Sequence, residues 1–336
     1  MANRDIVAIG TSAGGVEALL SLTKSLPRNL PASILLTIHL PRDSKSCLDD
    51  VLDRSGPLRA GFAQDGEAMR KSRIYIAPPD RHLIVDGDRL ALGEGPRENG
   101  SRPAIDPMLR SAAVCCGARS IGVVLTGALG DGASGLWAIE QAGGITVVQD
   151  PKDAAYAEMP RTALNRTKPD HVVSLKDIPE LLASLTHQPA GEAKALPASI
   201  KFEVEIARTG HSGMNEMDSI GRRSVLSCPD CGGIMWEIEE GELSRFRCHV
   251  GHTYTAELMS LALDENLRRS LASARRALDE RIALARKLHN QSKASGHHLV
   301  AENWAEKVKE FEREAEIIRD STRRMDRLAA QANASK

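Results

Sequence analysis

Three residues that together could catalyse acyl transfer lie at or shortly after the carboxyl end of an apolar run of the sequence. Ser12 lies in GTSAGG after the run IVAIG at 6–10, and His39 lies in the run SILLTIHL at 33–40. Asp131 lies in the glycine-rich segment LTGALGDG, which overlaps the end of the run SIGVVLTG. Open parallel sheets place their functional sites at the carboxyl ends of their strands. If the three runs are parallel strands, we expect the three side chains to meet.

A serine, a histidine and an aspartate have complementary roles in ester hydrolysis. The hydroxyl of Ser12 is a poor nucleophile near neutral pH, so His39 must remove its proton and later return it to the leaving alcohol. Asp131 would fix the imidazole tautomer and stabilise the imidazolium. Glycines such as Gly14 allow a sharp strand-to-helix turn at the serine, and the backbone N–H of Ala13 is expected to contribute to an oxyanion hole.

Each of the three residues also has a simpler interpretation. The glycines around Ser12 could bind phosphate at a helix N-terminus, but no Lys-Ser/Thr pair follows them as in a P-loop. His39 could be a structural residue at a strand end, and Asp131 a turn residue or a helix N-cap. Their convergence at strand ends favours the triad. The segment GTSAG fits the Gly-x-Ser-x-Gly turn of α/β-hydrolases, but those enzymes have the chain order Ser, Asp, His rather than Ser, His, Asp.

A second group of reactive side chains lies in residues 225–255. The segments CPDC and CHVGH contribute five candidate ligands, which are Cys228, Cys231, Cys248, His249 and His252. This spacing is typical of a zinc ribbon, in which three thiolates and one imidazole form a tetrahedron. We assign the imidazole to His252, with His249 as the alternative. Four protein ligands would make such a zinc ion structural rather than catalytic. The other interpretation is a set of reduced structural thiols.

The elements that must position these residues follow an α/β pattern over residues 1–186. Short apolar runs, rich in Val and Ile, lie at 6–10, 33–40, 73–78, 120–127, 144–150 and 171–175. Amphipathic segments between them favour helices at 14–26, 105–116, 133–142 and 177–185. The alternation predicts a doubly wound, mostly parallel, Rossmann-like three-layer α/β domain. Asp86 and Gly87, between alternating apolar residues, predict a hairpin inserted at a sheet edge.

The remaining chain contains three further segments. Residues 187–224 contain Pro and Gly without sustained apolar periodicity and are expected to be a linker. Because the Cys/His module at 225–255 lies beyond it, we expect metal removal to unfold the module and leave residues 1–186 active. Residues 256–332 carry two apolar stripes separated by Gly296, which predicts an antiparallel helical hairpin. This hairpin is a candidate for partner binding, although its mixed charges are more usual on a solvated face.

The composition excludes several classes of protein. The formal net charge of −1 argues against a nucleic-acid binder. No secretory signal opens the chain, and no segment has the roughly 18 apolar residues needed to cross a bilayer. The six cysteines are unevenly spread, which is not typical of a secreted disulfide framework. These observations favour a cytoplasmic protein of about two domains that does not insert into a membrane.

Six segments within residues 4–186 occur in the order and spacing of a known family. They are IVAIGTSAGGVEAL, LLTIHLP, RIYIAPPDRHL, RPAIDPMLRSAA, GVVLTGALGDGASG and GGITVVQDPKDAAYAEMPRTAL. In these segments the chain resembles the catalytic domain of the CheB-type protein-glutamate methylesterases of chemotaxis. The family's serine, histidine and aspartate correspond to Ser12, His39 and Asp131. The resemblance implies hydrolysis of glutamate methyl esters on methylated chemoreceptors, often deamidation of receptor glutamines, and no cofactor for catalysis.

The chain departs from the family's pattern in three ways. The family's loop LTGMGNDG reads LTGALGDG here, so Ala128 replaces a methionine near the oxyanion site, which affects the expected rate or substrate preference. The resemblance starts near the first residue, so we expect no N-terminal receiver domain, and a C-terminal extension is present instead. We therefore expect catalysis to survive and regulation to differ. The alternatives are a serine esterase or deamidase for a different protein, and a non-catalytic scaffold that presents the Cys/His module.

Overall fold

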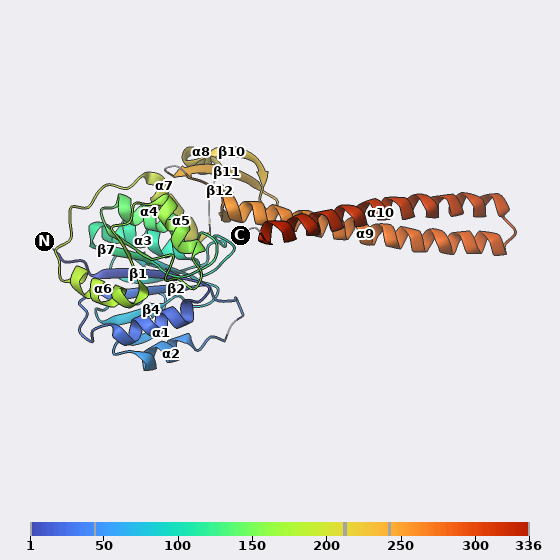
Figure 1. Cartoon of the computed structure of the whole chain (residues 1–336). Helices are drawn as coiled ribbons and strands as arrows, with labels where there is room; N and C mark the ends of the chain where they lie inside the picture. The colour runs from blue at the N-terminus through green and yellow to red at the C-terminus, as the bar shows by residue number, and fades with distance from the viewer. Residues whose placement is uncertain (1, 44, 211–213, 241–242, 335–336) are drawn as a thin grey trace. The chain divides into compact units, whose positions relative to one another are not determined.

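The structure is a computed structural model that divides into two compact units (Figure 1). It describes residues 2–43, 45–210, 214–240 and 243–334. The first unit comprises Met1–Met259 and the second comprises Ser260–Lys336. The first contains both the α/β domain and the Cys/His module, so these two parts form one body.

A seven-stranded parallel sheet forms the centre of the first unit. Its strands are β1 (Ile6–Thr11), β2 (Ser33–Ile38), β3 (Arg59–Phe62), β4 (Arg73–Ile76), β7 (Ser120–Val124), β8 (Ile145–Gln149) and β9 (His171–Val173). They lie in the order β3-β4-β2-β1-β7-β8-β9. Because β1 pairs in parallel with both β2 and β7, the carboxyl ends of these three strands share one edge. The predicted doubly wound parallel sheet is confirmed.

Helices cover both faces of the sheet and complete the three layers (Figure 1). One face packs against α1 (Gly15–Ser25), α2 (Leu48–Ser55) and α6 (Ile178–Thr186). The other packs against α3 (Ile105–Cys116), α4 (Ala133–Gln141) and α5 (Glu158–Arg166). Successive side chains of a strand point to opposite faces, so Val7 and Ile9 join the first cluster while Ile6 and Ala8 join the second. Burial on both faces explains why the strand is an unbroken apolar run.

Two β elements differ from their prediction. Strand β3 has the sequence RAGF at a sheet edge, where a charged residue and a glycine leave too weak an apolar signal to predict. The hairpin at Gly87 forms, as β5 (His82–Asp86) and β6 (Arg89–Gly93), with Gly87 at φ 64° in the turn. It is a separate two-stranded sheet, however, rather than an edge of the main sheet.

The segment expected to be a linker, 187–224, contains two helices instead. These are α7 (Ala198–Thr209) and α8 (Met214–Ile220). Val204 and Ala207 of α7 are buried with Ile84 of the β5–β6 hairpin. A Cβ atom at Gly93 would lie 2.3 Å from the carbonyl oxygen of Ala207, so only glycine allows this close approach. Flanking Pro and Gly residues hid a short amphipathic helix that joins the α/β domain to the Cys/His module.

The Cys/His module is a four-stranded antiparallel sheet in the order β10-β11-β12-β13. Its strands are β10 (Arg222–Ser227), β11 (Ile234–Glu240), β12 (Leu243–Cys248) and β13 (Thr253–Thr255). Trp236 of β11 is fully buried with Ile206 of α7 and Met217 of α8. The module therefore packs on the helices of the predicted linker.

The second unit consists of two long helices joined at a turn that includes Gly296 (Figure 1). α9 spans Ala256–Ala294, of which the residues from Ser260 onward belong to this unit, and α10 spans His298–Ala334. Leu278 and Ile282 of α9 pack against Phe311 and Ala315 of α10, as the two apolar stripes predict. Among the described residues, every helix is too short or too polar to span a bilayer.

Candidate active site

The structure brings the three predicted triad residues together at the carboxyl edge of the sheet. Ser12 follows β1, His39 follows β2 and Asp131 lies in the loop after β7. The Ser12 Oγ lies 3.0 Å from His39 Nδ1, and His39 Nε2 lies 2.7 Å from Asp131 Oδ2. The two contacts join residues that are 27 and 92 positions apart in the chain. Strand pairing therefore brings distant parts of the chain to one edge.

The hydrogen bonds fix the tautomer of His39. An ionised carboxylate can only accept hydrogen bonds, so Asp131 Oδ2 accepts one that His39 Nε2–H donates. Nδ1 then carries the free lone pair and accepts the hydrogen bond from the Ser12 hydroxyl. The imidazole is therefore set to act as a base toward Ser12, while the carboxylate stabilises the imidazolium that forms.

The backbone around Ser12 makes the sharp turn that the sequence predicts. Gly14 has φ 72° and is the N-cap of α1. A side chain there would also approach the Ala155 Cβ at 3.1 Å. The backbone N–H of Ser12 donates to the carbonyl of Thr126 at 3.0 Å, so it is not free to bind an oxyanion. The oxyanion role of Ala13, at the N-terminal end of α1, stays a prediction, as does that of Ala128, which is half-buried in the β7 loop.

Asp131 is held more tightly than the sequence indicates. Its side chain is 1% exposed. Besides His39, its oxygens accept hydrogen bonds from the Asn99 amide at 2.9 Å and from the backbone N–H groups of Ile105, Asp106 and Gly132. Burial acts to raise the pKa of Asp131, but the hydrogen bond and charge of His39 and these further donors hold that pKa well below its usual range. The carboxylate therefore stays ionised in the folded protein.

Two buried residues beside Asp131 were not identified from the sequence as part of the site. Asn99 donates its amide to both Asp131 and Asp106, at 2.9 and 3.0 Å. Burial, and then the negative charge of Asp131, raise the pKa of Asp106 to about 7. Asp106 carries a sequence signal, since with Arg110 it is one of two charged residues four positions apart in an apolar helix. Asn99 lies in a loop with no pattern around it that marks a role.

Comparison with known proteins identifies the α/β domain. Residues 7–182 match the CheB methylesterase family. This chain belongs to the CheB methylesterase family. The catalytic domain of the Thermotoga maritima CheB methylesterase superposes with a TM-score of 0.52 at 32% identity, and the alignment covers 55% of this chain and all of that one.

Relatives with known names agree with this family. A Leptospira interrogans protein, named provisionally as a protein-glutamate methylesterase/protein-glutamine glutaminase, is 36% identical over 184 residues, which cover 54% of this chain and 95% of the relative. A Pyrococcus abyssi protein of the same name without that qualification is 38% identical over 181 residues, which cover 53% of this chain and 49% of the relative. The resemblance read from the sequence segments is confirmed, and it covers the CheB domain rather than the residues that follow.

Outside the CheB domain, the module gathers four ligand atoms in a small volume. They belong to Cys228, Cys231, Cys248 and His252, and all lie within 4.8 Å of one another. His252 Nδ1 lies 3.7 Å from Cys228 Sγ and 3.4 Å from Cys248 Sγ, which lies 3.7 Å from Cys231 Sγ. A tetrahedral site with Zn–S bonds of about 2.3 Å and a Zn–N bond of about 2.0 Å has edges of about 3.5–3.8 Å. The residues present therefore fit a zinc ion.

The structure brings His252, not His249, into this cluster. His252 Nδ1 points to the thiols, and its Nε2 lies 3.9 Å from Asp230 Oδ2, which also accepts the Tyr254 hydroxyl at 2.7 Å. A carboxylate behind a ligating imidazole is the usual support of a metal site. The His249 ring instead covers Gly233, where a Cβ atom would lie 2.2 Å from it.

A buried network of ionic side chains joins the module to the CheB domain. Its members are Glu98, Arg110, Glu203, Arg245 and Arg247, each at most 2% exposed. Arg247 of β12 donates to Glu98 at 2.7 Å, and Arg110 of α3 pairs with the same carboxylate. Arg245 of β12 pairs with Glu203 of α7, which lies 3.3 Å from Arg110. Removing one partner of such a pair leaves a buried charge without compensation, at a cost of about 3–5 kcal/mol.

Stability should depend on pH through Glu98. Burial acts to raise its pKa, but Arg110 and Arg247 outweigh burial and lower it to about 2. Because the pKa is lower in the folded state, this stabilisation is present above about pH 4.5 and is lost as the pH falls toward 2. We expect the free energy of unfolding to decline over this range by up to about 1.4 kcal/mol per pH unit for this group. Denaturant titrations at several pH values should show a smaller dependence of the free energy of unfolding on pH in Glu98→Gln than in wild type. Glu94→Gln, which changes an exposed carboxylate, should keep the wild-type dependence.

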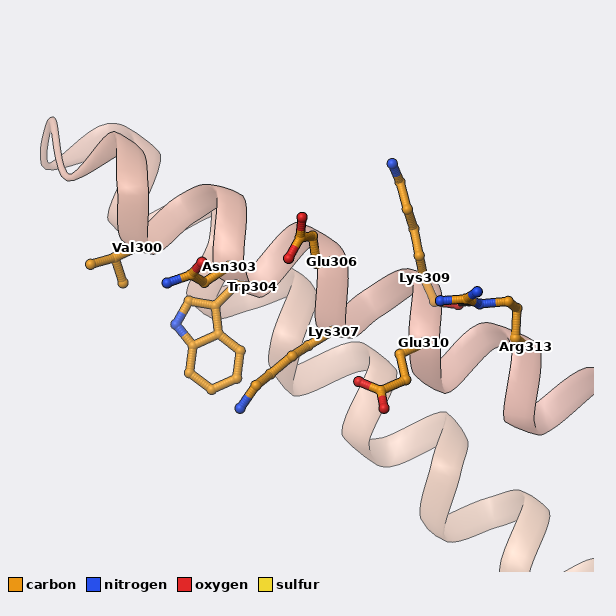
Figure 2. Close-up of a pocket in the computed structure, with 8 residues that line it drawn as sticks. All are labelled: Val300, Asn303, Trp304, Glu306, Lys307, Lys309, Glu310 and Arg313. Carbon is orange, nitrogen blue, oxygen red and sulfur yellow. Dashed lines mark hydrogen bonds between the residues drawn. The ribbon is translucent and has the colours of Figure 1, made fainter.

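The structure also has a groove on α10 (Figure 2). It is lined by Val300, Asn303, Trp304, Glu306, Lys307, Lys309, Glu310 and Arg313. The Lys307 amine lies 5.0 Å from the centroid of the Trp304 ring, and the other charges alternate in sign along the helix. No buried polar groups converge in it, so the groove has the character of a solvated helix face rather than a catalytic site.

Proposed function

We propose that this protein is a protein-glutamate methylesterase that uses Ser12 as nucleophile, His39 as general base and acid, and Asp131 as the carboxylate that orients His39. The observation that carries the proposal is the continuous hydrogen-bonded series Ser12–His39–Asp131 at the sheet edge, in a chain of the CheB family. The proposed substrates are glutamate methyl esters of chemoreceptors. Deamidation of receptor glutamines is a second reaction of the same site.

The reaction proceeds by acyl transfer. The Ser12 Oγ attacks the ester carbonyl while its proton passes to His39 Nδ1, and the resulting tetrahedral intermediate expels methanol as Nδ1 returns the proton to the leaving oxygen. Water then attacks the acyl-enzyme with the same proton transfers and releases glutamate and free Ser12. With glutamine as substrate, ammonia leaves instead of methanol. Each step uses only groups of this chain, and we propose no cofactor for it.

The test is methanol release from methylated chemoreceptors of the source organism. We expect purified protein to release methanol from them and to hydrolyse a small glutamate methyl ester. Hydrolysis of the small ester with none on the receptors would favour an esterase for a different protein. No hydrolysis of either, together with no labelling of Ser12 by an organophosphonate, would favour the scaffold.

We propose that the helical hairpin of the second unit selects the protein substrate or a partner. Among the described residues, the hydrophobic clusters of the CheB domain and of its contact with the module lie within the first unit, so a chain that ends after Met259 should fold. We expect this chain to hydrolyse the small ester at the wild-type rate and intact receptors at least several-fold more slowly. A chain that ends after residue 186 lacks α7 and should melt at a lower temperature. Much faster hydrolysis of the small ester by the 1–259 chain would mean that the hairpin inhibits.

A further inference from the structure

One short loop of the CheB domain, residues 97–101, contacts both the Cys/His module and the catalytic carboxylate. On the module side, the Asn99 backbone N–H donates to the carbonyl of Thr253 at 2.7 Å, and Glu98 pairs with Arg247. On the catalytic side, the Asn99 side-chain amide donates to Asp131 at 2.9 Å. Asn99 has φ 51°, a left-handed backbone that asparagine tolerates better than most residues. A backbone of this kind persists where its surroundings hold it.

The contacts on the module side come from the direct neighbours of two proposed metal ligands. Arg247 precedes Cys248, and Thr253 follows His252. The backbone N–H of Cys248 donates to the carbonyl of His252 at 3.0 Å, so the two ligand segments are also tied to each other. By each of two routes, one step along the chain and one hydrogen bond therefore connect a ligand residue to the loop at 97–101, through Arg247 or through Thr253.

Close to Asn99, apolar packing does not fill the seam between the two parts. A cavity of about 350 Å³ lies there, lined on the CheB side by Asn99, Asp106 and Gly130 and on the module side by Arg245 and Phe246, among others. At residues 97–101 polar contacts, chiefly the buried ionic network, connect the two parts, whereas apolar packing of Trp236 against Ile206 connects them through α7. The geometry of the polar contacts depends on the position of β12, whose last residue is the ligand Cys248.

We propose that metal binding by Cys228, Cys231, Cys248 and His252 sets the position of the catalytic carboxylate, through the contacts of Arg247 and Thr253 with residues 97–101 and of Asn99 with Asp131. Asn99 is a positioning residue: it acts on His39 through Asp131 and does not touch the substrate. Zinc is the metal that these ligands favour. The inference rests on the proposed function for its kinetic consequence, but the metal site and the coupling do not.

Loss of the metal should lower kcat rather than substrate affinity. The module contributes no residue to the Ser12–His39–Asp131 series, so KM should change little. Displacement of the carboxylate by about 1 Å would misorient His39, and errors of this size cost about a hundredfold in rate. This expectation replaces the earlier one that chelation leaves the CheB domain fully active, because the segment predicted as a linker contains α7, which packs on both parts.

The first measurement compares metal content with kinetics in the full-length chain. Wild type should contain about one equivalent of zinc, and Cys248→Ser should lose it together with about a hundredfold in kcat on a small glutamate methyl ester. Cys115→Ser is the matched control, because Cys115 lies on α3 outside the ligand cluster. It should keep both zinc and kcat. Zinc-free protein with wild-type kcat, or wild type purified without chelator and without zinc, overturns the proposal.

The second measurement asks whether the effect passes through Asn99. Asn99→Gly removes the amide and relieves the φ 51° backbone, so it tests the hydrogen bonds rather than strain. We expect a kcat loss of about a hundredfold that is not additive with Cys248→Ser, since both changes release the same carboxylate. Arg97→Ala, an exposed side chain in the same loop, should be silent. Additive losses overturn the proposed route.

The third measurement does not require catalysis. In Ser12→Ala, the proton that His39 Nε2 donates to Asp131 should give a low-field NMR signal with zinc bound, and a chelator should shift or broaden it. Circular dichroism should show that the CheB domain remains folded. An unchanged signal after zinc removal overturns the coupling. If wild type releases no methanol but this signal responds to zinc, the proposed function fails and the coupling stands.

Discussion

Replacing Ser12 with alanine is expected to abolish methanol release while the protein folds normally. Triad members act as a unit, so loss of the nucleophile should cost several orders of magnitude in kcat. The substitution removes one hydroxyl, which contacts only His39 among the described side chains, and leaves the Gly14 turn and the N–H contact with Thr126 unchanged. The measurement is methanol release together with covalent labelling by an organophosphonate, which should disappear with the hydroxyl.

The control for this substitution is Ser21→Ala. Ser21 is exposed on α1, the helix that Ser12 precedes, so it tests the effect of a lost serine hydroxyl on the same element. It should retain wild-type activity and labelling. Activity of Ser12→Ala within tenfold of wild type would refute the nucleophile assignment.

Replacing Asp131 with asparagine is expected to give the second largest loss, about 10⁴-fold in kcat. The carboxylate accepts hydrogen bonds from His39, from Asn99 and from three backbone N–H groups. An asparagine amide has one oxygen, so its NH₂ must replace an acceptor either on the His39 side or on the Asn99 side. If it faces His39, it forces the wrong tautomer. If it faces Asn99, it disrupts the loop at 97–101.

Activity as a function of pH distinguishes this loss from simple unfolding. Asp131→Asn should keep the far-ultraviolet circular dichroism of wild type and regain little activity at any pH, because no ionisation restores the carboxylate. Asp43→Asn, an exposed residue in the loop after His39, should behave as wild type. A folded Asp131→Asn variant with more than a tenth of the wild-type kcat would contradict the assigned role.

The triad follows from the sequence because local patterns dictate its geometry. Ser12, His39 and Asp131 each come after a buried strand, and parallel pairing leaves those strand ends no alternative to a shared edge. The candidate ligands of the module can also be predicted from a local pattern, because the spacing in CPDC places two thiols on one turn. Which histidine joins them depends on how β12 and β13 pair, and only the structure brings His252 rather than His249 to the thiols.

The residues that reasoning from the sequence missed depend on contacts between distant segments. Asn99 has no periodic neighbours, and its role arises because the loop after β6 lies beside both Asp131 and Thr253. Glu203 looks like an ordinary charged residue of a short helix, yet it is 1% exposed because two arginines surround it. A linker prediction from Pro and Gly content fails here because the packing partners of α7 are distant in the chain. Ile84 lies more than 100 residues before α7, and Arg245 of the module lies 42 positions after Glu203.

The pairing of Glu98 with Arg247 spans 149 positions of the chain, and this span has a consequence during synthesis. A growing chain lengthens by about 5–20 residues per second, so Glu98 waits about 7–30 s for its second arginine to be made. Ser12 and His39 are made before that interval and Asp131 early within it, so their strands can pair before Arg247 is made. The loop at 97–101 then still lacks Thr253 and the metal ligands. Under the proposed coupling, a newly made chain should acquire its full esterase rate late, after the last candidate ligand is translated and the proposed metal has bound, so the supply of zinc would set how soon a new molecule can act.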